Sequence, residues 1–507
     1  MTSLIALARS VILAGFDGTT FDSTLPEFGG YILFARNVAS IEQVRALTDA
    51  LRARADGTAP PIIAIDQEGG RVVRIAYGVE AMPSMMALGA AGDLELASRA
   101  GEQVAFDLRR AGCTLDLAPV LDLATHALNT VIGTRSLGSN PHDVAALGAA
   151  FAEGLERGGV TACYKHFPGH GATAVDSHDA LPVVNDDAAA LLGRDAAAFA
   201  AVAREASAIM GSHVVVRAFD EHFPVTISPR ISRDLLRSEL GFDGVLITDC
   251  LQMDALARVG GPVGSAIAAL AAGADLLTVS HDTELALTIA ATIERAVGDG
   301  TLARERLEEA YARTMRLRTA SQPPIPLHEF PLHPGVGREI ARRGITLLRG
   351  FAHADALGTI VVSFEEHADD GIGSIAGASL RRESPALEEL RLPLDPSAER
   401  TGVLLREIAQ SGRRPLVLAR RAHLHPAQAA AIDRILADAP DAIVVSMLEP
   451  FDTPLFARAQ HVLAAYGDDP AAIGGLADVL FGGSLPEGRL PVSVLPSRQR
   501  PASKNDE

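Results

Sequence analysis

The sequence predicts two α/β domains, an N-terminal (β/α)8 barrel followed by a smaller α/β sandwich domain with a mostly parallel sheet. Over roughly the first 320 residues, short apolar runs alternate with amphipathic helical stretches. The runs are β-branched or leucine-rich without strict alternation, which is typical of parallel strands buried on both faces. A proline-rich break then precedes a second set of such runs, and 507 residues are enough for a barrel and a further domain.

Eight apolar runs are the predicted strands of the barrel. They are VILAGF (11–16), GYILFAR (30–36), PIIAID (61–66), CTLDLAPV (113–120), VTACYKHF (160–167), AIMGSHVVV (208–216), GVLITD (244–249) and ADLLTVS (274–280). Between them lie predicted helices such as residues 41–52, where Val44, Leu47 and Leu51 share one face. Active sites of such barrels lie at the carboxyl ends of the strands, so polar residues there are the first candidates.

Residues 319–335 contain five prolines and no periodic pattern, which is typical of an interdomain linker. We therefore expect a catalytic barrel in 1–320, a linker in 321–338, an α/β sandwich in 339–495 and a disordered tail in 496–507. The predicted strands of the second domain are GITLLRG (344–350), GTIVVSFE (358–365), RPLVLARRA (414–422), DAIVVSM (441–447) and HVLAAYG (461–467).

Composition excludes some partners. The net charge of −18 argues against nucleic acid or an anionic membrane as partner, because both select basic surfaces. No apolar run approaches the roughly 18 residues that a membrane span needs, and residues 1–18 predict a first helix and strand instead of a signal peptide. Three widely spaced cysteines suit reduced thiols. We expect a cytoplasmic protein, with its oligomeric state left open.

Polar residues stand at the ends of several predicted barrel strands. Asp66 ends the third strand, Lys165 and His166 end the fifth, and Asp249 ends the seventh, while His213 lies on the sixth. A single aspartate in such a place is often only a helix N-cap. Several strands ending this way predict a polar pocket at one face. His213 fits a hydrogen-bonded core histidine as well as a ligand contact.

Lysine is rare in this chain. Of its 45 lysines and arginines, only Lys165 and Lys504 are lysines, and Lys504 lies in the predicted tail. A compact ammonium donor is therefore expected to matter at position 165.

The segment KHFPGHGATAVDSH (165–178) has three interpretations. The first is a polar surface loop, and the second is a metal site with His166, His170, Asp176 and His178 as ligands, for whose spacing the coordination chemistry gives no mechanical reason. The third interpretation is a catalytic loop in which Asp176 orients His178, because a carboxylate partner keeps a histidine active as acid and base near neutral pH.

Several motifs together resemble glycoside hydrolase family 3, in its β-N-acetylglucosaminidase branch. These motifs are KHFPGHGATAVDSH followed by LP, IDQEGGRVVR (65–74), VIGTRS (131–136) and ITDCLQM (247–253). The similarity starts at GYILFARN near residue 30 and extends into the second domain through GITLLRG and FGGSLPEGRLPVSV (481–494).

The resemblance implies a retaining, exo-acting β-N-acetylglucosaminidase that acts on short glycosides or cell-wall fragments. Asp249 would be the nucleophile, His178 the acid/base and Asp176 its partner. The residues that would bind the sugar are Asp66, Arg74, Arg135, Lys165 and His166. Without the motifs, Arg74 and Arg135 would be unremarkable surface arginines. The family implies no cofactor and no metal.

The sequence leaves several alternatives to the hydrolase. Relatives with the same His–Asp pair include phosphorylases, so one alternative is a β-N-acetylglucosaminide phosphorylase, and others are a β-glucosidase of the same family and a metal hydrolase. A sugar-binding protein is a further alternative, but it would not need Asp249, Asp176 and His178. Cys250, which follows the expected nucleophile, is expected to be a packed thiol instead of a reactive one. The second domain departs from the single-domain form of many relatives and is expected to supply no essential catalytic group.

Overall fold

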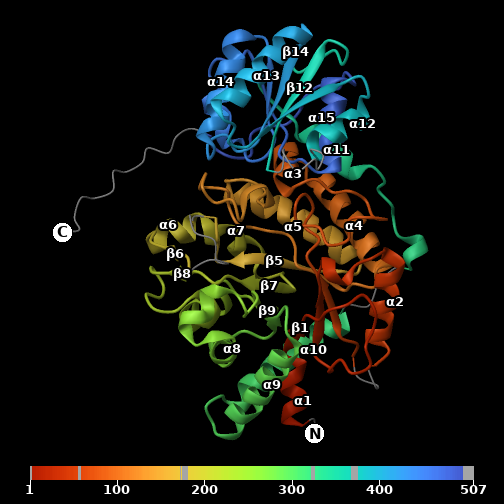
Figure 1. Ribbon diagram of the computed structural model, residues 1–507. Helices are drawn as coiled ribbons and strands as arrows, with labels where there is room; N and C mark the ends of the chain where they lie inside the picture. The colour runs from red at the N-terminus through yellow and green to blue at the C-terminus, as the bar shows by residue number, and fades with distance from the viewer. Residues whose placement is uncertain are drawn as a thin grey trace, which may run out of the picture. The chain divides into compact units, whose positions relative to one another are not determined.

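The computed structural model describes residues 3–54, 59–171, 173, 181–320, 326–366 and 375–494. Its contacts divide the chain into two units, Met1–Ile340 and Ala341–Glu507. Each unit is built around its own sheet (Figure 1).

The first unit is an eight-stranded parallel barrel, which confirms the predicted fold class. Its strands follow the order β10-β1-β2-β3-β4-β5-β7-β9, and every residue in them is buried. The Thr248 N–H donates to Leu276 O across the seam between β9 and β10, which closes the barrel. The strands are β1 (Ile12–Ala14), β2 (Gly30–Leu33), β3 (Ile62–Ile65), β4 (Leu115–Asp116), β5 (Thr161–Phe167), β7 (Ala208–Gly211), β9 (Val245–Thr248) and β10 (Leu277–Val279).

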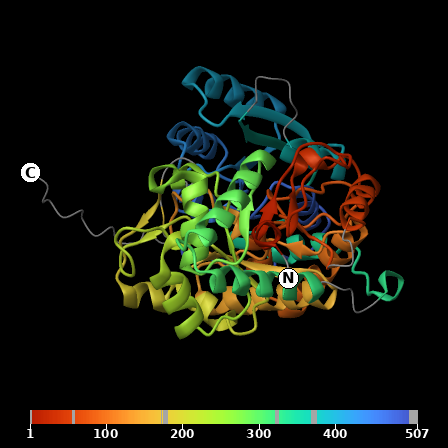
Figure 2. The ribbon, with the colours of Figure 1, turned by 90° about the horizontal axis from the view of Figure 1, so that it is seen from below.

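Helices surround this barrel, and the chain colours pass around it from red to green in Figure 2. Helix α2 begins after Ser40, whose hydroxyl accepts a hydrogen bond from the Gln43 N–H, and it buries Val44, Leu47 and Leu51 as predicted. The helices are α1 (Leu4–Ser10), α2 (Ile41–Arg52), α3 (Met85–Ala91), α4 (Leu94–Arg110), α5 (Pro141–Arg157), α6 (Ala188–Gly193), α7 (Asp195–Val202), the π-helix η4 (Arg230–Glu239), α8 (Gly261–Ala272), α9 (Thr283–Gly298) and α10 (Arg304–Ala320).

The predicted strand over 208–216 is divided in two. Only β7 belongs to the barrel; β8 (Val215–Val216) pairs in parallel with β6 (Val183–Val184) in a separate small sheet. After Ser212 the chain leaves the barrel, because the Val215 N–H donates to Pro182 O instead of to a barrel strand.

The second unit is a sheet with helices on both faces. Its strand order is β11-β16-β15-β14-β12-β13, and all pairs are parallel except β11 with β16. The mostly parallel sheet is therefore confirmed, with β13 as an edge strand that the sequence did not predict. The strands are β11 (Thr346–Arg349), β12 (Thr359–Glu365), β13 (Glu388–Pro393), β14 (Arg414–Ala419), β15 (Ile443–Ser446) and β16 (His461–Ala464).

Alternate residues of the central strands enter two separate cores. Val361 packs in the cluster that includes Ile473 of α15 (Pro470–Leu480), and its neighbour Val362 packs in the cluster that includes Ile432 of α14 (Pro426–Asp438). Helix α12 (Ile375–Glu383) contributes to the first cluster and α13 (Ala398–Ser411) to the second. Strands buried on both faces explain why these segments lack alternation.

The described part of the expected linker packs against the barrel unit. Phe330 is buried, and His333 Nε2 lies 2.6 Å from Glu102 Oε2 on α4. Helix α11 (Val336–Gly344) begins within the segment, and its Glu339 pairs with Arg99 at 3.1 Å. The expected tail, 496–507, lies outside the described residues. Within the described ranges, the helices are all too short or too polar to cross a membrane.

Candidate active site

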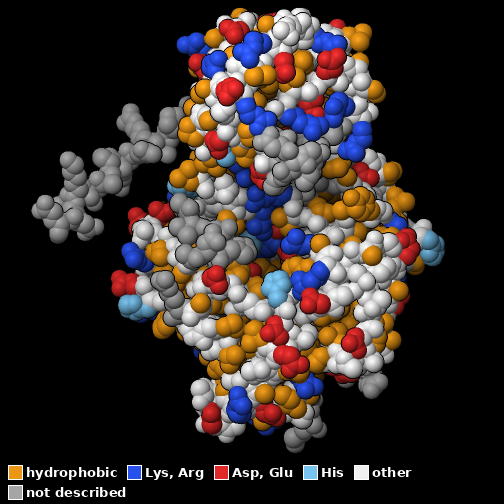
Figure 3. Space-filling model, viewed as in Figure 1, with side chains coloured by type: hydrophobic (Ala, Val, Ile, Leu, Met, Phe, Trp, Pro, Cys, Tyr) orange, Lys and Arg blue, Asp and Glu red, His pale blue; other side chains and the backbone are white. Residues whose placement is uncertain are grey.

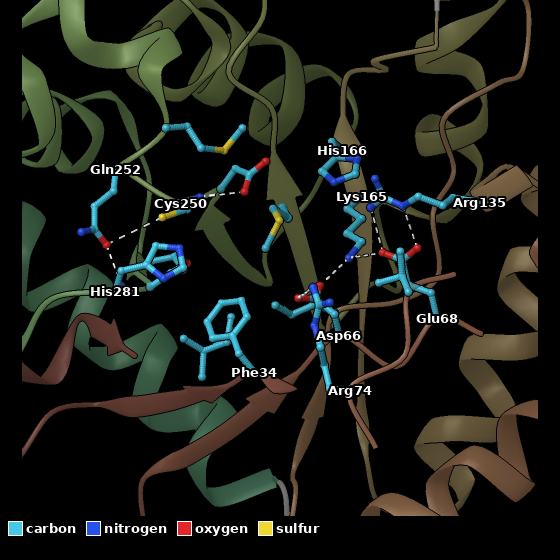
Figure 4. A pocket seen from close by; sticks show the side chains of 18 of the residues that line it. Phe34, Asp66, Glu68, Arg74, Arg135, Lys165, His166, Cys250, Gln252 and His281 are labelled. Carbon is cyan, nitrogen blue, oxygen red and sulfur yellow. Dashed lines mark hydrogen bonds and ion pairs between the residues drawn. The ribbon is translucent and has the colours of Figure 1, made fainter. Parts of the chain in front are cut away.

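A cavity of 460 Å³ opens at the carboxyl ends of the barrel strands. Figure 3 shows lysine and arginine side chains inside a hollow of the molecule, and Figure 4 shows the cavity from close by. Its size falls within the roughly 300–1,000 Å³ that is typical of small-ligand sites. The lining residues are Ile32, Phe34, Asp66, Glu68, Val72, Arg74, Leu117, Arg135, Lys165, His166, Met210, Asp249, Cys250, Gln252, Met253, Asp254, Thr278, Ser280 and His281.

One wall of the cavity carries an alternating row of charges (Figure 4). Lys165 Nζ lies 2.8 Å from Asp66 Oδ1 and 2.6 Å from Glu68 Oε1. Arg74 Nη2 pairs with the other oxygen of Asp66 at 3.3 Å. Arg135 holds both oxygens of Glu68 through its Nε and Nη2, each at 2.8 Å. Three cations and two anions thus present fixed donors and acceptors to a polar ligand.

Glu68 and Lys165 stay ionised because oppositely charged neighbours surround each of them. Burial alone would raise the pKa of Glu68, but the charges of Arg135 and Lys165 outweigh it and hold that pKa well below its usual value. Burial alone would lower the pKa of Lys165, but Asp66 and Glu68 raise it above the usual value. Lys165 is therefore a permanent ammonium donor.

A bulge in β5 lets two consecutive side chains face the cavity. Lys165 is in register with Met210 of β7, whereas Phe167 is in register with Gly211, so His166 is the extra residue. In a regular strand, neighbouring side chains point to opposite faces. The bulge explains why Lys165 and His166 both line the cavity.

Asp122, which follows β4, holds the ring of His166. Its Oδ2 lies 2.6 Å from His166 Nδ1, and Asp122 is completely buried. Burial would raise its pKa, but His166 and the other hydrogen-bond donors lower it below the usual value. An ionised carboxylate only accepts hydrogen bonds, so His166 Nδ1 carries a proton.

Asp249 directly follows β9 and lines the cavity. Its Oδ1 accepts a hydrogen bond from the Cys250 backbone N–H at 2.7 Å. Burial would raise its pKa, but His213, His166 and the Cys250 N–H outweigh burial and lower it. Asp249 is therefore an ionised carboxylate at neutral pH.

The sequence left His213 between a core histidine and a ligand contact, and it favoured a packed thiol for Cys250. His213 is buried, with Nδ1 at 2.5 Å from Thr226 Oγ1 and Nε2 at 2.9 Å from the Cys250 carbonyl oxygen. His213 does not line the cavity, but it lies close enough to Asp249 to lower the pKa of that carboxyl group. Cys250 does line the cavity, and burial raises the pKa of its thiol. All three cysteines of the chain are unpaired thiols.

The structure brings six of the eight predicted site residues together around one cavity: Asp66, Arg74, Arg135, Lys165, His166 and Asp249. Asp176 and His178 lie outside the described residues, so the catalytic-loop and metal-site interpretations of 165–178 stay predictions.

Sequence reasoning missed several residues of the site. Glu68 lies inside the quoted motif IDQEGGRVVR, two residues after Asp66, and that proximity was the available signal. Phe34 and His281 line the cavity with ring centroids 5.5 Å apart (Figure 4). Gln252 connects this pair to Cys250, because its Oε1 accepts from the His281 backbone N–H at 2.8 Å and lies 4.0 Å from Cys250 Sγ.

Comparison with known proteins identifies the class. Residues 23–317 match the glycosyl hydrolase family 3 N-terminal domain. The chain is 40% identical over 266 residues to a β-hexosaminidase of Chromobacterium violaceum, covering 51% of this chain and 73% of that protein. A glycoside hydrolase family 3 β-N-acetylglucosaminidase from Paenibacillus sp. str. FPU-7 is similar over 97% of this chain and 99% of its own, with a TM-score of 0.88 and 33% identity.

The chain therefore belongs to glycosyl hydrolase family 3, and it is a glycoside hydrolase with the barrel and α/β sandwich architecture. The resemblance drawn from the motifs is confirmed.

Proposed function

We propose that this enzyme is a retaining, exo-acting β-N-acetylglucosaminidase that removes terminal β-linked N-acetylglucosamine from short glycosides. The observation that carries this proposal is Asp249, an ionised carboxylate that lines the same cavity of small-ligand size as the row of charges. The relatives with the stated identities are named as β-hexosaminidase and β-N-acetylglucosaminidase, which supports the same substrate class.

In the proposed mechanism, Asp249 attacks the anomeric carbon of the bound sugar and forms a covalent glycosyl ester. His178, oriented by Asp176, protonates the departing oxygen and then activates the water that hydrolyses the ester. These two residues are assigned from the sequence motif alone. Because the Asp249 pKa is lowered, the nucleophile needs no base to activate it.

The row of charges is proposed to bind the sugar hydroxyls. Asp66 and His166 offer an acceptor and a ring nitrogen, Arg74 and Lys165 offer charged donors, and charge-assisted hydrogen bonds are stronger than neutral ones. Arg135 binds Glu68 with Nε and Nη2 and the Val131 carbonyl oxygen with Nη1, so two of its five N–H groups are left for a ligand.

Water is the proposed acceptor, and a phosphorylase is not favoured. A β-glucoside phosphorylase has a TM-score of 0.82, but its 20% identity shows the fold alone. The enzyme is further proposed to act in the cytoplasm on cell-wall fragments or chitobiose-like sugars. The three unpaired thiols support a reducing compartment, and the absence of tryptophan supports a short substrate.

Two measurements test this function. A panel of aryl N-acetylglucosaminide, glucoside and xyloside is assayed with and without phosphate; hydrolysis of the N-acetylglucosaminide, without sugar 1-phosphate, is expected. Intact-mass analysis with a slow fluorinated N-acetylglucosaminyl donor is expected to show one added sugar on Asp249. Preference for the glucoside, phosphate-dependent turnover, or a sugar located on Cys250 would contradict the proposal.

A further inference from the structure

One buried carboxylate outside the cavity lining contacts two separate parts of the segment 165–178. Asp122 Oδ2 accepts from the His166 backbone N–H at 3.2 Å and lies 2.6 Å from His166 Nδ1. Asp122 Oδ1 accepts from the His170 backbone N–H at 2.6 Å. Asp122 is completely buried and is not part of the cavity wall.

The first contact fixes the direction of the His166 ring. Because the ionised Asp122 accepts the Nδ1 proton, the other ring nitrogen, Nε2, is left for a ligand. A carboxylate partner of this kind sets both the tautomer and the orientation of an imidazole. Without it, the ring could rotate away from the cavity that it lines.

The second contact holds the backbone at His170, which precedes the expected acid/base in the sequence. The backbone at His170 and Gly171 is also held by Asn129, whose Nδ2 donates to His170 O at 2.9 Å and to Gly171 O at 3.3 Å. A Cβ at Gly171 would overlap the carbonyl oxygen of Leu123, so the chain passes close to the segment that carries Asp122. In the sequence, His178 follows His170 by eight residues.

We propose that Asp122 is a positioning residue that serves both halves of the reaction. Through His166 it orients a group that binds the sugar, and through the His170 N–H it fixes the backbone eight residues before the proposed proton donor, His178. This inference rests on the proposed function, because it takes His166 as a sugar contact and His178 as the acid. It predicts that one carboxylate supports substrate binding and leaving-group protonation together.

The experiment uses the full chain with Asp122→Asn, which keeps the side-chain shape but replaces one accepting oxygen with an amino group. Two substrates are compared. The dinitrophenolate of a dinitrophenyl N-acetylglucosaminide departs without protonation, whereas the sugar leaving group of chitobiose must be protonated to depart. Asp122→Asn is expected to raise KM for both substrates several-fold. It is also expected to lower kcat on chitobiose about 10–100-fold more than on the aryl substrate, which is part of the roughly 10²–10⁴-fold effect of a general acid.

Double mutants then separate the two contacts. When His166→Ala is already present, adding Asp122→Asn should not raise KM further. When His178→Ala is already present, adding Asp122→Asn should not change the ratio of kcat on the two substrates further. Asn129→Asp removes the donor to His170 O and Gly171 O without touching His166, so it should show the leaving-group effect on kcat with little change in KM.

Asp220→Asn is the matched control. Asp220 is also buried, has a lowered pKa and accepts from two backbone N–H groups and from Ser228 Oγ, but it does not line the cavity. It should change the melting temperature without changing the ratio of the two substrates.

Several outcomes would overturn the inference. One is that Asp122→Asn lowers kcat equally on both substrates. Another is that Asp122→Asn raises KM as much in the His166→Ala variant as in the parent enzyme. If Asp122→Asn melts below the assay temperature, Asn129→Asp decides, and an unchanged substrate ratio overturns the loop half. If His178→Ala affects both substrates equally, the assigned acid is wrong, whereas the His166 double mutant still tests Asp122.

Discussion

Lys165 Nζ lies 2.6 Å from Glu68 Oε1, and both side chains are almost fully buried, with exposed fractions of 2% and 1%. Removing water from a single charge is costly, and such a pair is tolerated only when each charge keeps its partners. Glu68 has two cationic partners, Lys165 and Arg135. Glu68, which the sequence analysis did not single out, is therefore the centre of the row of charges.

Glu68→Gln is expected to destabilise the fold and weaken substrate binding. Removing one partner of a buried ion pair typically costs about 3–5 kcal/mol, because it leaves uncompensated charge. KM for an N-acetylglucosaminide should rise at least tenfold, since Lys165 and Arg135 lose their common anchor. Urea unfolding and steady-state kinetics measure both.

The control for Glu68→Gln is Asp49→Asn, which breaks the exposed pair with Arg45. Exposed pairs contribute about 0–1 kcal/mol, so this variant should behave like the parent enzyme. Equal stability of the two variants would show that the buried row of charges contributes nothing to folding.

Asp249→Ala is expected to lose several orders of magnitude in rate and to regain turnover with azide. The small anion fits the space of the missing carboxylate and attacks from the same side, so the product should be the α-glycosyl azide. Product analysis by NMR identifies the anomer. A β-azide, or no rescue together with near-normal hydrolysis, would assign the nucleophile elsewhere.

The barrel could be predicted from sequence because its strands leave a direct compositional signal. Every strand residue is buried, so most positions of each run are apolar, and the polar exceptions include the site residues Lys165 and His166. Strand β13 was missed because it is an edge strand, and Glu388 to Arg391 on it are exposed or half-buried. Such a mixed pattern resembles a loop.

The site could be predicted only where its residues end a strand or belong to a motif. Asp66, Lys165 and Asp249 satisfy both conditions. Asp122 satisfies neither condition, because its role depends on contacts with His166, which is 44 residues away in the sequence. Contacts of this kind come from the packing of neighbouring strands, which a single sequence does not encode in any local pattern.

Cys250→Ser is expected to keep activity within about tenfold of the parent enzyme. The Cys250 group that contacts the nucleophile is its backbone N–H, at 2.7 Å from Asp249 Oδ1, and the substitution preserves it. Burial raises the pKa of the thiol, so little thiolate is present at pH 7 and alkylation by iodoacetamide should be slow. Rapid alkylation with loss of activity would show a reactive cysteine.

His178→Ala is expected to impair substrates with basic leaving groups far more than activated aryl glycosides. The gap should be about 10²–10⁴-fold, the usual range of general acid catalysis. Asp176→Asn should give a smaller gap of the same kind, because it removes the charge that favours the protonated imidazole. Kinetics on a series of aryl leaving groups measures the gap as a slope, and equal losses along the series would mean that His178 only positions the sugar.

Asp452, in the second unit, is expected to make the stability of the protein depend on pH. Burial raises the pKa of Asp452 to about 7, although Ser446 Oγ donates to its Oδ1 at 2.5 Å and the Ala422 N–H to its Oδ2 at 3.1 Å. Between about pH 4 and 7, the unfolded chain releases this proton while the folded protein keeps it. The unfolded state then binds fewer protons, so stability falls as pH rises, by at most about 1.4 kcal/mol per pH unit.

Asp452→Asn carries no titrating proton, and its amide can satisfy both partners, with the oxygen accepting from Ala422 and the nitrogen donating to Ser446. Its stability should therefore depend less on pH than that of the parent protein over this window, with the larger gain at pH 7. Melting temperatures of both proteins at pH 5, 6 and 7 measure the difference. Parallel curves would mean that Asp452 is already ionised in the folded protein at pH 5, and that its hydrogen bonds offset the cost of burying the charge.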